Sequence, residues 1–187
     1  MRKILKTEFF DRSSVTVAEE LLGKFLVRER KIGEKKEREM YKIVETEAYE
    51  GLLDRASHAS RGQTVRNAPM YGLPGTIYVY FTYGMHFMFN IVCGKKGHPA
   101  AVLIRGVESC SGPGRLTKKL GIDKRLNGKM LGKTSGLWVQ WVEDRIEVRD
   151  KSYEIRKVKI LRTPRIGIRY AGPIWSKKLY RFVLQSL

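Results

Sequence analysis

Cysteine and long apolar runs are scarce in this 187-residue sequence. Cys93 and Cys110 are the only cysteines, which excludes a disulfide framework and favours a reducing compartment. No stretch approaches the roughly 20 apolar residues of a membrane span, and residues 1–12 are too charged for a signal peptide. We therefore expect a cytoplasmic or nucleoid-associated protein with no membrane attachment.

Acidic residues are also few relative to basic ones. The chain has 37 Lys and Arg against 19 Asp and Glu, a formal net charge of +18 at pH 7. A positive field of this size favours polyanionic partners, and nucleic acid is the leading class. Ribosomal proteins, proteins at anionic membrane surfaces and some thermophile proteins share this balance, so charge selects a partner class and not a function.

The histidines and cysteines lack the spacing of a metal site. His58, Cys93, His98 and Cys110 have none of the paired short separations that structural zinc sites use. We therefore expect neither a metal nor another cofactor.

At 187 residues the chain is long enough for one well-buried core and short for two, so we expect a single domain over residues 1–187. The order of its predicted elements favours the α+β class. We expect a mainly antiparallel, curved, open-barrel-like sheet with flanking helices, and a strand that delivers Arg105 at its end. Expected strands span residues 25–27, 41–49, 76–83, 87–92, 100–104, 137–148 and 155–161, and residues 175–187 are expected to form a strand or a final helix. Expected helices span about 16–22, 115–120 and about 124–131.

Residues 41–49 put two carboxylates on one side of a predicted strand. Glu45 and Glu47 share a face because strand side chains alternate with period 2. Burying two acids beside an apolar run is costly, so either both remain in water or one sits in a cleft with a raised pKa. The cleft would make Glu47 a candidate general base, whereas a solvated edge strand remains an alternative on this stretch alone.

The segment over residues 50–76 is rich in Gly and Pro and predicts a long ordered loop, which in compact domains often carries function. Within it, Thr64 and Arg66 are candidate phosphate contacts. Tyr83 precedes Gly84 and Met85 at the tight turn of a predicted hairpin. An aromatic residue there is typical of an exposed wedge that enters a base stack.

Taken together, these segments resemble the alkyladenine (3-methyladenine) DNA glycosylase family. The resemblance covers most of the chain in order, although it is looser over residues 1–20 and 120–160. The segments that carry it are residues 44–49, 58–67, 74–80 and 83–86, Asn90, residues 112–116 and 164–168, and the pair Ala171 and Gly172.

The resemblance implies a monomeric, monofunctional enzyme of base excision repair that acts on double-stranded DNA. It would flip out alkylated or deaminated purines such as 3-methyladenine, 7-methylguanine, hypoxanthine and ethenoadenine, and hydrolyse the N-glycosidic bond without a metal. In that scheme Glu47 is the general base that activates water, and Arg105 helps to position the water and the flipped nucleotide.

The same resemblance implies how the base and the duplex are held. Tyr49 and His58 would stack on one face of the damaged base and Tyr80 on the other, while Asn90 would crowd the purine 2-position and exclude guanine. The wedge that fills the gap in the duplex would be Tyr83, flanked by Met85 and His86.

Three other functions stay open. A non-catalytic nucleic-acid-binding protein explains the charge but not the acidic pair, since carboxylates repel phosphates. A damage sensor without catalysis would use the same scaffold, and a metal-dependent nuclease would use Glu45 and Glu47 as ligands.

Overall fold

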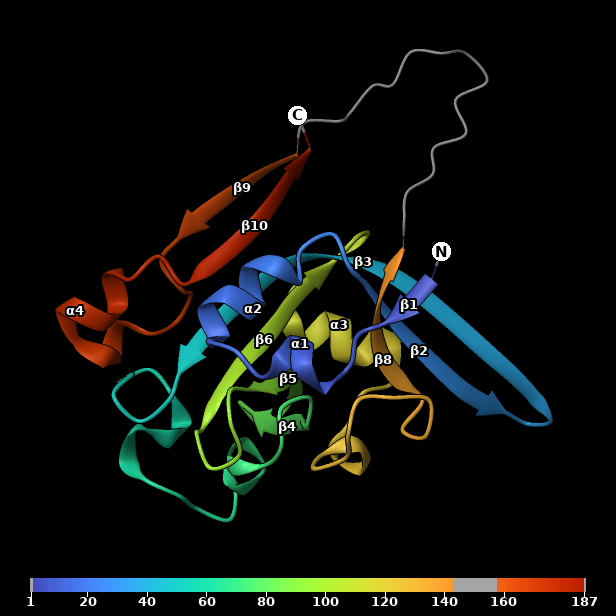
Figure 1. Ribbon diagram of the computed structural model, residues 1–187, viewed down its shortest axis with the longest axis horizontal. Helices are drawn as coiled ribbons and strands as arrows, with labels where there is room; N and C mark the ends of the chain where they lie inside the picture. The colour runs from blue at the N-terminus through green and yellow to red at the C-terminus, as the bar shows by residue number, and fades with distance from the viewer. Residues whose placement is uncertain (1, 143–157, 187) are drawn as a thin grey trace.

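The computed structural model describes residues 2–142 and 158–186, and a large antiparallel sheet organises them (Figure 1). The strands are β1 (Arg2–Ile4), β2 (Phe25–Ile32), β3 (Lys35–Glu50), β4 (Ile77–Thr82), β5 (His86–Cys93), β6 (Ala100–Val107), β7 (Cys110–Ser111), β8 (Leu137–Val142), β9 (Val158–Thr163) and β10 (Arg181–Ser186). The helices are α1 (Thr7–Phe10), α2 (Ser14–Glu20), α3 (Pro113–Leu120) and α4 (Gly172–Lys177). Short 3₁₀ turns are η1 (His58–Arg61), η2 (Ala68–Tyr71), η3 (Lys124–Leu126) and η4 (Arg169–Ala171).

The sheet follows the path β1-β8-β2-β3-β6-β5-β4, with β7 paired to β6 and β10 paired to both β3 and β9. Every strand pair in the described part of the chain is antiparallel. Within residues 2–142 and 158–186, β1 and β4 do not pair with each other, so the sheet stays open. The predicted α+β class with a mainly antiparallel sheet is confirmed.

Helices α2 and α3 pack on the sheet and complete its core. Helix α2 buries Val17 and Ala18, Leu21 directly after it is buried too, and α3 buries Leu116 and Leu120. These positions follow the i, i+3, i+4 spacing that gives a helix one apolar face. Each fully buried leucine contributes about 1.5–3 kcal/mol by removal from water. This core holds β3 and β6, the strands that carry the acidic pair and Arg105.

A register shift between β3 and β6 sets the geometry of the acidic pair. The shift occurs on both sides of Glu45, between Ile43 and Thr46. Gly106 allows the close approach, because a Cβ there would lie 3.3 Å from the Cβ of Glu45. Strand β6 continues past Arg105, so that residue lies inside the strand and not at its end, which corrects the sequence prediction.

The first hairpin is longer than predicted, because its charged tip is also paired. Glu29 of β2 forms an ion pair with Arg38 of β3, with 2.6 Å between Oε2 and Nη2. Opposite charges across a strand pair stabilise the ladder instead of ending it. Strands β2 and β3 therefore pair up to Ile32 and Lys35.

The helix predicted over residues 124–131 is wrong beyond Leu126. Asn127 ends the turn, and its Oδ1 accepts a hydrogen bond of 2.9 Å from the backbone N–H of Val79. The predicted strand residues 143–148 and 155–157 lie outside the described residues.

Candidate active site

Strand β3 brings Glu45 and Glu47 to one face of the sheet, as their spacing predicts. Glu45 is nearly buried, and its Oε1 accepts hydrogen bonds from the Nε atoms of Arg105 at 3.0 Å and Arg181 at 2.7 Å. Thr46 points the other way and donates to the carbonyl of Ala18 in α2. Glu45 thereby fixes two guanidinium groups beside its neighbour Glu47.

Glu47 has no exposed surface and three hydrogen-bond donors. Its Oε1 accepts from the backbone N–H of Ile166 at 2.7 Å, and its Oε2 accepts from the Tyr49 hydroxyl at 3.0 Å and from Nη1 of Arg105 at 3.4 Å. A carboxylate offers about four lone-pair sites, so these donors leave one acceptor site. Burial raises the pKa of Glu47, although the Arg105 charge and these bonds act in the opposite direction.

A buried ion pair that sequence analysis missed supports this carboxylate. Arg165 and Asp54 are both fully enclosed, and Nη2 of Arg165 lies 2.9 Å from Oδ1 of Asp54. Arg165 also donates to the carbonyl of Ala48 and lies over the Tyr49 ring, with Cζ 4.7 Å from the ring centroid. Because Ile166 follows directly, this pair positions the N–H that donates to Glu47.

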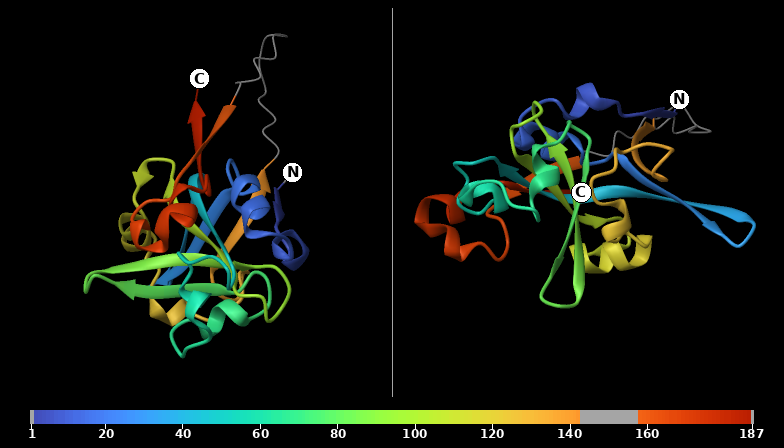
Figure 2. Two further views of the ribbon diagram at one scale, coloured as in Figure 1. Left: turned by 90° about the vertical axis from the view of Figure 1, so that its left-hand side faces the viewer. Right: turned by 90° about the horizontal axis from the view of Figure 1, so that it is seen from below.

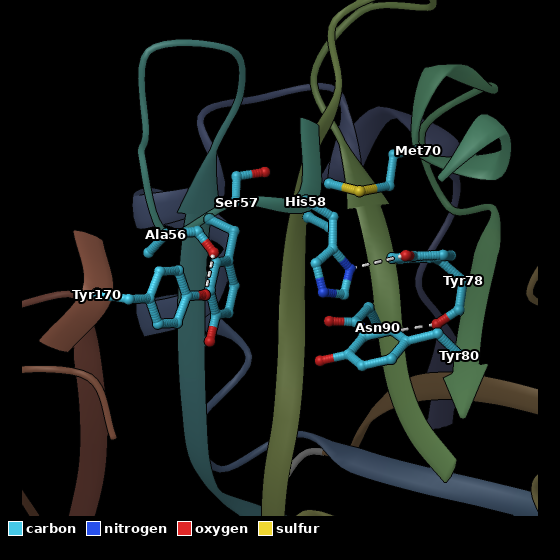
Figure 3. Close-up of a pocket in the computed structure, with 10 residues that line it drawn as sticks. Ala56, Ser57, His58, Met70, Tyr78, Tyr80, Asn90 and Tyr170 are labelled. Atoms are coloured by element: carbon cyan, nitrogen blue, oxygen red, sulfur yellow. Dashed lines mark hydrogen bonds between the residues drawn. The ribbon is translucent and has the colours of Figure 1, made fainter. Parts of the chain in front are cut away.

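An aromatic pocket opens to solvent beside this cluster, and its mouth and interior together contain about 340 Å³ of space not filled by atoms (Figure 3). The four predicted base-binding residues all line this pocket, and so do other residues that the sequence did not indicate. The lining residues are Tyr49, Ala56, Ser57, His58, Met70, Tyr78, Tyr80, Asn90, Ala101 and Tyr170. Glu47 lies behind Tyr49, since the Tyr49 hydroxyl bonds to it.

His58 and the tyrosines of β4 form one wall of the pocket. Nδ1 of His58 and the hydroxyl of Tyr78 are 2.9 Å apart, so the buried Tyr78 side chain has a polar partner in the pocket. The rings of His58 and Tyr80 meet edge to face with centroids 4.5 Å apart. Burial and then the charge of Arg66 lower the pKa of His58, so its imidazole is neutral at pH 7.

Tyr170 stands on the opposite side of the pocket and was also missed (Figure 3). It lies in η4, and its hydroxyl donates to the carbonyl of Ala56 at 3.1 Å. No pattern near Tyr170 distinguishes it from other surface tyrosines. Only the path of the chain back from β9 brings it to the pocket.

Asn90 lies on the floor of the pocket and is 3% exposed. Its Nδ2 donates to the carbonyls of Tyr78 and Met88, at 3.2 and 3.4 Å. These two bonds fix the orientation of the amide, and no hydrogen bond from the described residues reaches its Oδ1. The side chain is therefore held in one position on the pocket floor.

The turn between β4 and β5 has the exposure expected of a wedge. Tyr83 is 81% and Met85 68% exposed, and His86 is exposed at the start of β5. Tyr83 adopts a φ of 53°, the left-handed region that non-glycine residues rarely occupy, and Gly84 follows at 66°. Such conformations often mark functional positions, and the role of this tip as a wedge stays a prediction.

The two candidate phosphate contacts differ in their surroundings. Arg66 is exposed, donates to the carbonyl of Phe81 at 3.0 Å and lies over the Tyr80 ring at 5.3 Å. Thr64 and Asn67 exchange hydrogen bonds that close their loop. Asn67 links this loop to the pocket wall, because its Nδ2 donates to the carbonyl of His58.

In residues 2–142 and 158–186, no group of three or more His, Cys, Asp or Glu side chains is arranged to hold a metal ion. The helices of this described part are all too short and polar to cross a bilayer.

Comparison with known proteins identifies the family. The sequence model of the methylpurine-DNA glycosylase family matches residues 8–110 and 107–186. The chain belongs to this family. It is therefore a DNA glycosylase, a hydrolase that acts on N-glycosyl bonds in the repair of DNA.

Relatives in archaea and bacteria match over nearly their whole length. A Methanocella arvoryzae protein is 41% identical, with 90% of this chain and 86% of the relative covered. A Sodalis glossinidius protein is 40% identical over 96% and 95%, and one from Legionella pneumophila strain Paris is 38% identical over 100% and 96%. Each is provisionally named a 3-methyladenine DNA glycosylase.

Proposed function

We propose that this glycosylase flips alkylated or deaminated purines out of duplex DNA and hydrolyses their N-glycosidic bonds with water as the nucleophile. Its substrates would be 3-methyladenine, 7-methylguanine, hypoxanthine and ethenoadenine. The observation that carries the proposal is the buried Glu47 carboxylate, which keeps one free acceptor site directly behind the Tyr49 wall of the pocket.

In the proposed reaction Glu47 accepts a proton from water while the water oxygen forms a bond to C1′ of the sugar. The C1′–N bond breaks, and its electron pair leaves with the base. Positive charge develops on the sugar ring, and the nearby carboxylate stabilises it. The raised pKa of Glu47 makes it a better proton acceptor than an ordinary carboxylate, and the step requires no metal or cofactor.

Arg105 would orient the carboxylate and the attacking water. It reaches Glu47 with Nη1 and is itself held by Glu45 through Nε. Burial alone would lower the pKa of Arg105, but the charges of Glu47 and Glu45 raise it, so the guanidinium stays charged. It would then contact the flipped nucleotide as a fixed cation.

The aromatic pocket suits a positively charged, methylated purine. Neutral His58 does not repel such a base, and the faces of Tyr49 and Tyr80 attract it through cation–π interaction. A base held between His58 and Tyr80 needs about 3.5 Å of contact on each face. Since these rings meet edge to face with centroids 4.5 Å apart, they must turn and move apart when the base enters.

Selectivity would have two sources. Damaged pairs cost less to open, by up to a few kcal/mol, so their bases reach the pocket more often. The fixed amide of Asn90 would then crowd the 2-amino group of guanine, and it would crowd that of 7-methylguanine equally, but cationic 7-methylguanine leaves more easily than neutral guanine. Tyr83, Met85 and His86 would fill the space left in the duplex, while Thr64 and Arg66 would contact its phosphates.

The test measures release of free base from duplexes that carry one 3-methyladenine analogue, hypoxanthine or ethenoadenine, with EDTA present. The proposal predicts that the wild-type protein releases the base and leaves the DNA strand intact at an abasic site. Glu47→Gln should release none on the same timescale. Tight lesion binding by the wild type without release would instead support the damage sensor, and loss of release with EDTA would support a metal-dependent reaction.

A further inference from the structure

A second cleft, whose lining shares no residue with the aromatic pocket, lies between residues 28–36 of the β2–β3 hairpin and residues 121–136. We call it the distal cleft. It encloses about 1060 Å³ of empty space open to solvent, and seven Lys and Arg side chains line it against two acidic ones. Nothing in the proposed reaction uses it.

The acidic residues of the distal cleft already have partners, so they do not cancel its field. Glu29 pairs with Arg38 and Lys36, and Asp123 pairs with Arg125 at 2.7 Å. In contrast, Lys31, Lys129 and Lys133 have no carboxylate within 4.0 Å among the described residues. These three lysines keep a net positive cleft for an outside anion.

Arg28 builds the back of the distal cleft instead of binding a carboxylate. It donates to the carbonyl of Leu120 at 3.1 Å and to those of Ser135 and Gly136 at 3.2 and 3.1 Å. These bonds tie the end of α3 to the loop on the other side of the cleft. Burial, and then the charge of Arg30, lower the pKa of Arg28, which reflects the crowding of cations there.

Helix α3 connects the distal cleft to the wedge. A Cβ at Gly114 would lie 2.8 Å from Cγ of His86, and one at Gly121 would lie 2.8 Å from Nη1 of Arg30. The eight residues of α3 span about 12 Å. Its exposed face carries only cations, Arg115, Lys118 and Lys119, while its leucines face the core.

Figure 2 (right) shows α3 and η3 between the β4–β5 hairpin, which carries the wedge, and the projecting β2–β3 hairpin. One basic surface therefore runs from the wedge, along α3, to the distal cleft. Phosphates on one DNA strand follow each other about every 3.4 Å along the axis. A span of about 12 Å thus corresponds to between three and four base pairs.

We propose that the distal cleft binds the phosphate backbone of the duplex whose damaged base enters the aromatic pocket, about three to five base pairs from the flipped nucleotide. The distance in base pairs rests on the proposed function, because it is counted from a nucleotide flipped into the aromatic pocket. Its occupant is duplex DNA, because the lining is cationic, is joined to the wedge by the basic face of α3, and holds one large apolar side chain, Leu126, for a protein partner. The added contact would hold undamaged duplex during the search for lesions.

The test pairs a double variant in the distal cleft, Lys129→Ala with Lys133→Ala, with a matched control, Lys95→Ala with Lys96→Ala. All four lysines are exposed, and the control pair lies past the far end of β5 from the wedge. Binding to 25-base-pair duplexes, with and without a lesion, is measured against salt. Each lost phosphate contact lowers the slope of log K against log salt by about 0.9.

We expect the distal-cleft variant to lose about 1–2 units of slope and roughly tenfold or more in affinity for both duplexes, with an unchanged excision rate at saturating protein. Methylphosphonates placed three to five nucleotides from the lesion should weaken the wild type but not this variant. The control should behave as the wild type does.

Equal slopes for the two double variants, or additive effects of the variant and the methylphosphonates, would overturn the proposal. So would weaker binding to an RNA hairpin with unchanged binding to DNA, which would assign the distal cleft to RNA. A protein whose salt slope depends on the distal cleft but which releases no base would keep this inference and remove the proposed reaction.

Discussion

The two ends of the candidate site differ in how they hold their side chains. At the inner end, Glu47, Arg165 and Asp54 are buried. Arg165 bonds to Asp54, and the N–H of the next residue, Ile166, donates to Glu47. At the outer end, Tyr83 and Met85 stand in solvent. A buried charge must have fixed partners because it has lost its water, whereas an exposed aromatic ring needs none. Substitutions at the inner end should therefore lower the free energy of unfolding.

The outer end owes its shape to the backbone. The left-handed conformation of Tyr83 costs of the order of 1–3 kcal/mol, and the β4–β5 pairing on both sides of the turn maintains it. The ring consequently points outward with little packing of its own. Substitutions at the inner end should therefore alter folding and the excision rate. Substitutions at the outer end should alter DNA binding.

The largest expected effect on stability comes from breaking the buried ion pair. Arg165→Met leaves the enclosed carboxylate of Asp54 without its partner, which should reduce the free energy of unfolding by about 3–5 kcal/mol. Urea denaturation measures this change. Arg162→Ala, which breaks the more exposed pair with Glu19, should cost at most about 1 kcal/mol. Equal losses would mean that the buried pair does not organise the inner end.

Removing the outer ring should affect binding and spare the fold. Tyr83→Ala should weaken binding to a lesion-containing duplex by about 1–3 kcal/mol, the value of one aromatic–base stack. Its free energy of unfolding should stay within about 0.5 kcal/mol of the wild type. Leu53→Ala, at another exposed apolar residue, serves as the control in the same fluorescence titration. An unfolded Tyr83→Ala protein would show that the ring is part of the core.

Asn90 should control which bases are excised. Asn90→Ser removes the amide that faces the pocket and should raise excision of bases with a 2-amino group about tenfold relative to hypoxanthine. Competition assays between 7-methylguanine and hypoxanthine duplexes measure the ratio. An unchanged ratio would remove Asn90 from the account of selectivity.

The smallest expected effect is a shift in the pH profile. The Tyr49 hydroxyl donates to Glu47 and so lowers the pKa of the carboxylate. Tyr49→Phe keeps the ring but removes this donor, so the pKa of Glu47 should rise further. Since Glu47 acts as a base when ionised, the acidic limb of the excision rate should move to higher pH. The excision rate is measured in single turnover across pH. An acidic limb at the same pH in both proteins would show that this limb does not report the ionisation of Glu47.

Local pattern was enough to predict the parts of the site that lie close together in sequence. The period of a strand put Glu45 and Glu47 on one face, and the tight turn predicted the exposure of Tyr83. The resemblance to a known family supplied the pocket residues Tyr49, His58, Tyr80 and Asn90. Their roles in binding stay predictions.

What could not be predicted depends on contacts between distant segments. The partners Asp54 and Arg165 are 111 positions apart, and the Ile166 N–H lies 119 positions from Glu47. Neither residue type reveals burial from its own neighbours, because Asp and Arg are usually exposed. Arg105 was expected at a strand end for a related reason, since a register shift appears only when two strands pair.

The most direct test of the account compares rate and affinity for Glu47→Gln on one duplex with a single hypoxanthine. We expect Glu47→Gln to have a single-turnover excision rate lower by about 10²–10⁴-fold, with a dissociation constant for that duplex within about threefold of the wild type. An excision rate equal to that of the wild type would contradict the assignment of Glu47 as the base. Loss of rate and affinity together would contradict the separation of the inner end from DNA engagement.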